Sequence, residues 1–178
     1  MKKLMILFLV SILTISCNDG KKENEKIRYT QDSEEINTLK SVIQNYENGE
    51  WDKYKTHYAD TAKLYYNSRQ SQNVDQVLDD HKQSLEGLSN YEFPDEHDEY
   101  EMVVTDDDET WVNYWGDWQG TIAENDSMIE IPVHITARFI DGKIVAEHVY
   151  FDNSGMIAAY EALGVKRSMD SINKVQTN

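Results

Sequence analysis

The chain has 178 residues, and 33 acidic against 17 basic residues give it a formal net charge of −16. A surface this acidic repels phosphate backbones, which argues against nucleic acid as a partner. Cys17 is the single cysteine, so no intramolecular disulfide can form and the fold must depend on its hydrophobic core.

The first residues follow the pattern of a bacterial lipoprotein signal peptide. Two lysines precede an apolar run at 4–13, which is too short to cross a bilayer because a spanning helix needs about 20 apolar residues. Ser16 then stands directly before Cys17, as lipoprotein signal peptidase requires, although Thr14 occupies the position where leucine is usual. We therefore expect residues 1–16 to be removed and Cys17 to become the site of lipid attachment. A membrane-anchoring helix and an ordinary secretory signal are the alternatives.

Residues 17–31 are polar and charged. Such a composition buries too little apolar surface to order itself, which predicts a flexible tether. Asn18, rather than an aspartate, follows the cysteine, and in the Gram-negative sorting pattern this favours the outer membrane. The N-terminus therefore predicts a protein of the cell envelope that is held at the membrane through a lipid on Cys17.

Apolar residues recur at helical spacing in the next part of the chain. The segments concerned are 33–48, a short helix with Trp51, Tyr54 and Tyr58 in its apolar stripe, and 71–85. Ser33 is a suitable N-cap for the first helix, and Gly49 is a suitable stop. Between the second and third helices, residues 62–67 alternate in the manner of a strand.

The spacing then changes from helical to alternating, which is typical of strands. Strands are predicted at 91–93, 100–105, 109–122, 129–140 and 143–151. Asp141-Gly142 is a two-residue hairpin turn between the last two, while Pro132 implies a sheet edge or a bulge. A final helix is predicted at 152–163. Helices followed by an antiparallel meander of four to six strands predict an α+β fold.

Three segments carry a family resemblance. They are YENGEWDKY at 46–54, the step from Tyr58-Ala-Asp60 into the strand at 62–66, and FIDGKIVAEHVYFD at 139–152. Together they resemble the SnoaL-like branch of the nuclear transport factor 2-like superfamily, with a domain at 32–165 and a polar tail at 166–178. The resemblance implies a curved antiparallel sheet wrapped on about three N-terminal helices plus a short C-terminal helix. This is a cone-shaped, cystatin-like roll with an apolar pocket.

The resemblance also implies what such a pocket can do. The superfamily includes isomerases, polyketide cyclases, epoxide hydrolases, dehydratases and many non-catalytic binding domains. Its members often form dimers through the outer face of the sheet, so a homodimer is expected here. The fold by itself does not assign an activity.

Glu147 is the first candidate for chemistry. Alternation along the last strand places it on the same face as Val149 and Phe151, and Val133 and Ile135 belong to the apolar face of the preceding strand. These apolar faces should line the pocket, which makes Glu147 the one carboxylate aimed inward. Burial would raise its pKa and suit it to general acid or base catalysis.

Two acidic residues have structural alternatives to catalysis. Glu147 could instead lie near the sheet margin, where it is hydrated or is paired with Arg138 or Lys143. Asp152 is the second catalytic candidate, because it ends the YFD motif and an acidic residue on a late strand acts as acid or base in SnoaL-like cyclases. Its position directly before a helix equally suits an N-cap, worth about 1 kcal/mol.

Aromatic side chains are expected to form part of the pocket wall. Trp111 and Trp115 share one face of the strand at 109–122, and aromatic walls with few polar groups suit a hydrophobic or ring-shaped ligand. The predicted ligand pocket consists of Tyr58, Trp111, Trp115, Val133, Ile135, Val149 and Phe151. Packing in the core or at a dimer interface explains the two tryptophans equally well.

His134 and His148 share one face of two adjacent strands. No third ligand at a recognisable spacing accompanies them, so no metal is predicted, and no other cofactor is expected. A dimer surface or a solvated outer sheet face is the expected role of this polar patch.

The favoured function is non-catalytic. The domain would bind a small apolar or amphipathic molecule, or serve as an accessory module at the cell envelope, because the sequence shows no nucleophile–base pair, metal cluster or phosphate loop. The second hypothesis is an isomerase, cyclase or hydratase that works through Glu147 or Asp152. The third is a protein–protein interaction module that uses the outer sheet face.

Overall fold

The computed structural model describes residues 27–164. The predicted signal peptide, Cys17, most of the tether and the tail at 166–178 lie outside these residues, so the predictions about them stay predictions. The elements within the described range are β1 (Tyr29–Thr30), α1 (Glu34–Glu47), α2 (Trp51–Thr56), β2 (Tyr58–Tyr66), α3 (Val74–Leu85), β3 (Leu88–Glu92), a 3-10 helix (Asp95–His97), β4 (Glu99–Val104), β5 (Thr110–Ile122), β6 (Met128–Ile140), β7 (Lys143–Phe151) and α4 (Ser154–Ala162).

The first and third helices begin at side chains that cap them. Ser33 accepts a 3.2 Å hydrogen bond from the Ile36 backbone N–H at the start of α1, as predicted. At α3, Asn73 accepts a hydrogen bond from the Gln76 N–H, and the Gln76 side chain accepts one from the Asn73 N–H. This capping box starts α3 at Val74, later than the helical spacing predicts.

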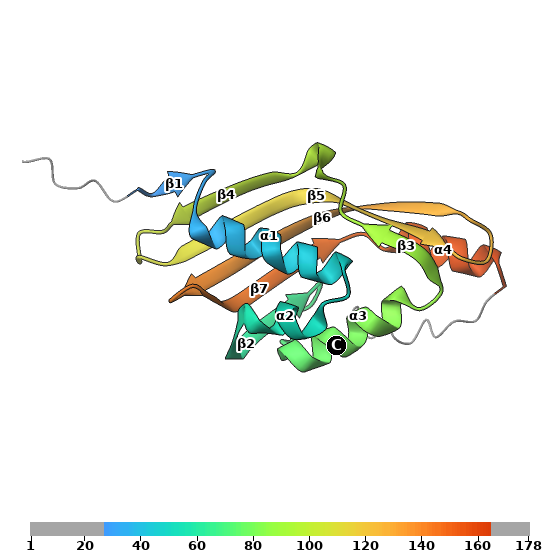
Figure 1. Ribbon diagram of the computed structural model, residues 1–178, viewed down its shortest axis with the longest axis horizontal. Coiled ribbons are helices and arrows are strands. Elements are labelled where there is room, and N and C mark those ends of the chain that lie inside the picture. The colour runs from blue at the N-terminus through green and yellow to red at the C-terminus, as the bar shows by residue number, and fades with distance from the viewer. Residues whose placement is uncertain (1–26, 165–178) are drawn as a thin grey trace, which may run out of the picture.

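The described strands form one curved, seven-stranded sheet (Figure 1). Its order is β1-β4-β5-β6-β7-β2, and β3 pairs with β5 beyond the end of β4. The α+β fold with three N-terminal helices and a C-terminal helix is confirmed. The sheet is mixed rather than wholly antiparallel, because β2 runs parallel to β7. These two strands are far apart in the chain, and a long connection permits a parallel pair that alternation cannot reveal.

The boundary between α2 and β2 differs from the prediction. Tyr58 has the helical spacing from Tyr54, but α2 ends at Thr56 and Tyr58 begins β2, where it pairs with Ile144 of β7. The Tyr54 and Tyr58 rings still stack, with centroids 5.1 Å apart. The spacing therefore indicated a real contact, although the second residue belongs to a strand.

Two glycines on β5 make room for the side chains of their own strand. A Cβ on Gly116 would lie 2.0 Å from the Tyr114 hydroxyl oxygen, and a Cβ on Gly120 would lie 2.3 Å from the Trp118 ring. Each aromatic ring thus lies along the strand, over the glycine two residues later. Tyr114 and Trp118 are both buried in this position and cover the inner face of the sheet.

Two irregularities occur where β6 meets β7. Pro132 stands where β7 has already ended, since the last pair of these strands is Val133 with Phe151, and the proline therefore lies at a local edge. At the other end of the pair Val145 is left out of the register, because Ala146 pairs with Arg138 and Ile144 pairs with Phe139. As a result Ile144, and not Val145, is fully buried on the inner face.

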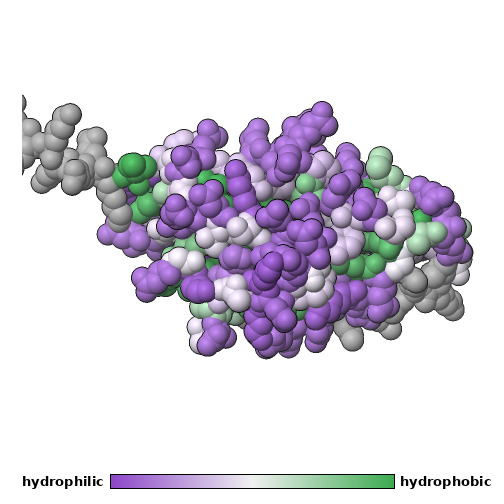
Figure 2. Space-filling view, viewed as in Figure 1, coloured by the Kyte–Doolittle hydropathy of each residue, from purple (hydrophilic) through white to green (hydrophobic). Residues whose placement is uncertain are grey.

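The hydrophobic core lies between the inner face of the sheet and the helices α1, α2 and α3 that cover it (Figure 1). Met156 and Tyr160 of α4 are buried as well and extend the core at the other end of the sheet. The face shown in Figure 2 is largely hydrophilic, as the net charge leads one to expect. In residues 27–164, no helix combines the length and the apolar character needed to cross a membrane.

Candidate functional site

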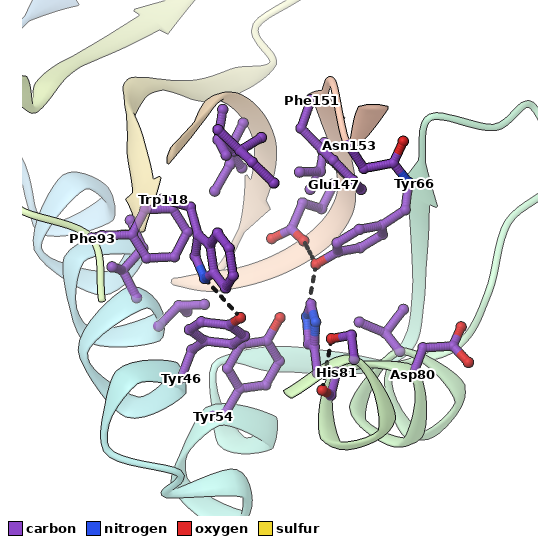
Figure 3. A pocket seen from close by; sticks show the side chains of 18 of the residues that line it. Tyr46, Tyr54, Tyr66, Asp80, His81, Phe93, Trp118, Glu147, Phe151 and Asn153 are labelled. Atoms are coloured by element: carbon purple, nitrogen blue, oxygen red, sulfur yellow. Dashed lines mark hydrogen bonds between the residues drawn. The ribbon is translucent and has the colours of Figure 1, made fainter. Parts of the chain in front are cut away.

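A cavity of about 190 Å³ lies between the inner face of the sheet and the three covering helices (Figure 3). Most of its lining side chains are apolar or aromatic, and they come from helices and strands throughout the chain. Four residues of the predicted pocket line it, namely Val133, Ile135, Val149 and Phe151. Among the polar side chains that line it are Tyr54, Tyr66, His81 and Glu147.

Glu147 is buried in the wall of this cavity, with 2% of its surface exposed. The Tyr58 hydroxyl donates a 2.8 Å hydrogen bond to Oε2, and the Tyr66 hydroxyl donates a 3.0 Å hydrogen bond to Oε1. Each carboxylate oxygen thus accepts one phenolic proton. Since each oxygen has two lone pairs, each retains one position for a ligand.

The hydrogen bonds continue on both sides of the carboxylate. The Tyr54 and Tyr58 hydroxyl oxygens are 2.9 Å apart, and His81 Nε2 lies 3.3 Å from the Tyr66 hydroxyl oxygen. A phenol has a single proton, so when Tyr58 and Tyr66 both donate to ionised Glu147, Tyr54 is the donor to Tyr58, and His81 donates to Tyr66 in its Nε2–H tautomer. In this state four side chains form one hydrogen-bonded chain around the carboxylate.

Burial determines the charges in this network. Desolvation raises the pKa of Glu147 to about 7, against the hydrogen bonds from Tyr58 and Tyr66, which favour the charged form. Burial also lowers the pKa of His81 to about 4 and raises the pKa of Tyr54 above its ordinary value. Glu147 is thus the group that changes charge near neutral pH, among partners that stay uncharged.

Strand pairing positions Glu147 and its two donors. On β7 it lies opposite Ala137 of β6 and Leu64 of β2. Tyr66 follows two residues after Leu64, and Tyr58 lies at the start of the same strand, before an irregularity in the register. Both tyrosines therefore approach the carboxylate from the parallel neighbour strand.

The two alternative partners of Glu147 do not reach it. Arg138 forms an ion pair with Glu109 at 2.9 Å, and the Lys143 ammonium donates to the Thr56 backbone carbonyl. Arg138 projects from the outer face, since the alternation that turns Glu147 inward turns Arg138 outward. Within residues 27–164, Glu147 is therefore buried without a cationic partner, and desolvation dominates its pKa.

An aromatic wall lies across the cavity from Glu147 (Figure 3). The Trp118 Nε1–H donates a 3.1 Å hydrogen bond to the Tyr46 hydroxyl, which satisfies the buried indole. Phe93 packs edge-on against Tyr46, with ring centroids 5.8 Å apart. The cavity thus presents aromatic rings on one side and a carboxylate on the other.

Trp111 and Trp115 lie on the outer face, so the prediction that they line the pocket is wrong. Trp115 is 41% exposed and stacks on His134, with ring centroids 4.9 Å apart. Tyr114 and Trp118 are the buried aromatic residues of β5. Asn113 and Asp117 share the face of Trp111 and Trp115, whereas Val112 and Ile122 share that of Tyr114 and Trp118, so the polar residues rather than the aromatic rings mark the outer face.

The structure also corrects the roles of Asp152 and Tyr58. Asp152 is exposed, and its carboxylate accepts a 2.9 Å hydrogen bond from the Ser154 N–H, which lowers its pKa. It does not line the cavity, and the N-cap of α4 is Asn153. Asp152 therefore belongs to the turn into α4 and lies outside the wall of the cavity. Tyr58 does not line the cavity either, but its hydroxyl donates a hydrogen bond to Oε2 of Glu147.

His134 and His148 lie on the outer face, half-buried among aromatic rings. His148 stacks on Tyr65 with centroids 4.4 Å apart, and the Tyr150 ring is nearly parallel to both histidines. Across residues 27–164 no three His, Cys, Asp or Glu side chains are grouped so that they could hold a metal ion.

Three residues that define the cavity were not predicted from the sequence, namely His81, Tyr66 and Trp118. His81 shares the apolar side of α3 with Val77 and Leu78, and a histidine in a buried stripe was a usable signal. On β2, Tyr66 lies two residues after the buried Leu64, so alternation places both side chains on the same face. Trp118 was overlooked because the prediction placed Trp111 and Trp115 on the inner face of β5 instead.

No protein-family model matches this chain, and no curated protein matches it. Solved structures do match its fold. PrhC from Penicillium brasilianum NBRC 6234 has a TM-score of 0.64 at 12% identity, and the match covers 82% of this chain and 97% of that chain. IdmH from Streptomyces antibioticus, a candidate polyketide cyclase, has a TM-score of 0.57 at 16% identity over 75% of this chain and 100% of that chain.

A protein with a ketosteroid isomerase-like fold from Catenulispora acidiphila DSM 44928, solved in complex with trimethylamine, has a TM-score of 0.54 at 11% identity. That match covers 68% of this chain and 89% of the other. Candidate SnoaL-like polyketide cyclases from Shewanella species are similar to the chain as well. The described domain thus shares the fold of these SnoaL-like and ketosteroid isomerase-like proteins, as the sequence motifs predict.

Proposed function

We propose that this domain is an acid–base enzyme that moves a proton on a small, largely apolar substrate, with Glu147 as the general acid and base. One observation carries the proposal. Glu147 is the single buried carboxyl group of residues 27–164, has no cationic partner among them, faces an apolar cavity, and has its pKa raised to about 7. A general base is most effective when its pKa lies near the working pH, and groups tuned in this way concentrate at functional sites.

Each step of the proposed reaction uses groups of this chain. Ionised Glu147 accepts a proton from a carbon atom of the substrate, and the protonated carboxyl then returns that proton to another atom. Tyr58 and Tyr66 fix the carboxyl group and stabilise its charged form. Because the proton taken up is also the proton returned, an isomerisation of this kind needs no further reactant.

The size of the cavity restricts the substrate. An apolar cavity of about 150 Å³ holds one benzene molecule, so a cavity of about 190 Å³ takes a compound only slightly larger, unless part of it extends into solvent. The trimethylamine in the Catenulispora acidiphila complex is a molecule of this compact class. A fused polycyclic substrate would not fit inside the cavity as it stands.

A compact probe for proton abstraction tests the proposal. The compound 5-nitrobenzisoxazole opens when a base removes its carbon-bound proton, and the phenolate product absorbs visible light. We expect turnover to rise with pH through about 7 as Glu147 ionises, and Glu147→Gln to lower the rate by about a hundredfold or more. The variant Asp60→Asn, which removes an exposed carboxylate, is the control. Equal rates in the protein and in Glu147→Gln would refute the assignment.

Non-catalytic binding is the second candidate. It is favoured by the hydrogen bonds that Glu147 already accepts on both oxygens from Tyr58 and Tyr66, which is how a buried structural carboxylate is satisfied. On this alternative the cavity holds an apolar or amphipathic ligand, and replacing Glu147 by Gln changes affinity but no rate.

The proposal extends to the location of the enzyme. Based on the N-terminal sequence, we propose that a lipid on Cys17 anchors the domain in the cell envelope, with the outer membrane favoured. Mass spectrometry of the native protein should find residues 1–16 removed and a lipid-modified Cys17 as the first residue. An unmodified Cys17 would contradict the anchor.

A further inference from the structure

The charges around the cavity are of one sign. Among the described residues that line it, two are carboxylic acids, Glu147 and Asp80, and none is Lys or Arg. Glu147 lies inside, whereas Asp80 is half-buried at the rim and accepts a hydrogen bond from Gln72. An anionic ligand would enter an apolar space with no positive group to receive it, at a high desolvation cost.

The uncharged part of the lining is unusually rich in aromatic rings. They are Tyr46, Tyr54, Tyr66, Phe93, Trp118 and Phe151. Figure 3 shows Trp118 and Tyr46 on one side of the open space and Tyr66 with Glu147 on the other. Aromatic faces attract cations through the ring quadrupole, and the attraction is strongest where water is excluded.

We propose that the cavity takes a compact methylated ammonium ion, a tertiary or quaternary amine, in preference to a neutral or anionic molecule of the same shape. The aromatic rings contact its methyl groups, and Glu147 supplies the opposite charge. The net charge of −16 further raises the local concentration of cations around the protein. The inference deepens the proposed function, because it names the charge class of the molecule that the same cavity binds.

Methylation matters because of how Glu147 is bonded. A primary ammonium has three N–H donors that need acceptors, but the tyrosines leave only one lone pair on each oxygen of Glu147, and the remaining walls are mostly apolar. A methylated ammonium spreads its charge over methyl groups and needs few or no acceptors. It therefore suits a cavity that offers charge and apolar surface but few free lone pairs.

A pair of ligands with the same shape tests this inference. Choline and 3,3-dimethylbutan-1-ol differ in that a carbon atom of the alcohol replaces the quaternary nitrogen. We expect the chain isolated from its native host to bind choline about tenfold or more tightly than the alcohol, measured by calorimetry at pH 8. Glu147→Gln, which keeps the shape of the side chain, should remove most of this preference. Asp60→Asn, which removes the same charge from the surface, should keep it.

The outcomes separate this inference from the proposed enzyme. Equal or tighter binding of the alcohol would overturn the preference for a cation but leave Glu147 as a candidate base. Failure of both ligands to bind would also overturn the inference, whereas turnover of 5-nitrobenzisoxazole is measured independently. Binding of choline without any turnover of that probe would uphold the inference and count against the enzyme. A preference for choline that persists in Glu147→Gln would overturn the role of Glu147 as the opposite charge.

Discussion

The Tyr66 hydroxyl donates a 3.0 Å hydrogen bond to Glu147 Oε1, although the two residues lie 81 positions apart in the chain. This bond joins β2 to β7, the parallel pair of the sheet. It also favours the charged carboxylate, while burial favours the neutral acid. The balance of these two effects brings the pKa of Glu147 to about 7, where a modest change in its surroundings changes its charge.

Glu147→Gln should change how stability depends on pH. The pKa of Glu147 is raised from 4.5 to about 7 in the folded protein, so the folded state holds more protons than the unfolded state in this window. Its contribution to the free energy of unfolding therefore falls as pH rises from 4.5 to 7, by up to about 3 kcal/mol. His81, with a pKa lowered to about 4, acts in the opposite direction in both proteins.

Urea unfolding of the unsubstituted protein and of Glu147→Gln at several pH values gives the difference between their free energies of unfolding. The effect of His81 is common to both proteins and cancels from this difference. We expect the protein to lose stability relative to Glu147→Gln as pH rises through this window. A difference that stays constant between pH 4.5 and 7 would show that the pKa of Glu147 is not raised in the folded protein.

Tyr66→Phe should raise the pKa of Glu147 further. The substitution removes a donor to the charged carboxylate but keeps the ring, and hydrogen bonds to charged groups contribute about 1.5–3 kcal/mol, so a shift of about one unit or more is expected. Carbon-13 NMR of the labelled Glu147 carboxyl group measures it. Tyr65→Phe is the matched control, because Tyr65 stacks on His148 on the outer face. A similar shift in both variants would contradict the assignment.

Much of the fold followed from local patterns in the sequence. Ser33 capped the first helix as predicted, and the alternation of β6 and β7 correctly turned Val133, Val149 and Glu147 inward. These predictions succeeded because one face of each strand is apolar and the other is polar. Burial then follows from the hydrophobic effect alone.

The errors had two causes. On β5 the prediction weighed only the tryptophans, although Asn113 and Asp117 share the face of Trp111 and Trp115 and so mark it as the more polar, outer face. The parallel pairing of β2 with β7, by contrast, is a long-range choice, and it brings Tyr66 to Glu147. Sequence patterns contain no information about such distant pairs.

The outer sheet face should mediate the expected homodimer. Trp115 and Tyr150 are 41% and 51% exposed, and both flank His134 on adjacent strands. Apolar rings exposed together on one sheet favour association with a second copy. The double substitution Trp115→Ser with Tyr150→Ser should therefore convert a dimer to a monomer in sedimentation equilibrium. Tyr29→Ser, which changes an equally exposed tyrosine on β1, should not. A monomeric state of the unsubstituted protein would contradict this expectation.

Gly116→Ala and Gly120→Ala should destabilise the domain because of the rings that lie over these glycines. The new methyl groups would meet the Tyr114 hydroxyl oxygen at 2.0 Å and the Trp118 ring at 2.3 Å. Both rings are buried and cannot move without repacking, so we expect a loss of about 1–3 kcal/mol in the free energy of unfolding.

Gly155→Ala is the control for these substitutions. No atom lies within 4 Å of the position that its Cβ would take, and Gly155 belongs to helix α4, where alanine is preferred. This variant should be neutral or more stable, by up to about 1 kcal/mol. Urea unfolding measures all three proteins. If Gly120→Ala were as stable as Gly155→Ala, the Trp118 ring could not lie along β5, and the aromatic wall opposite Glu147 would have a different shape.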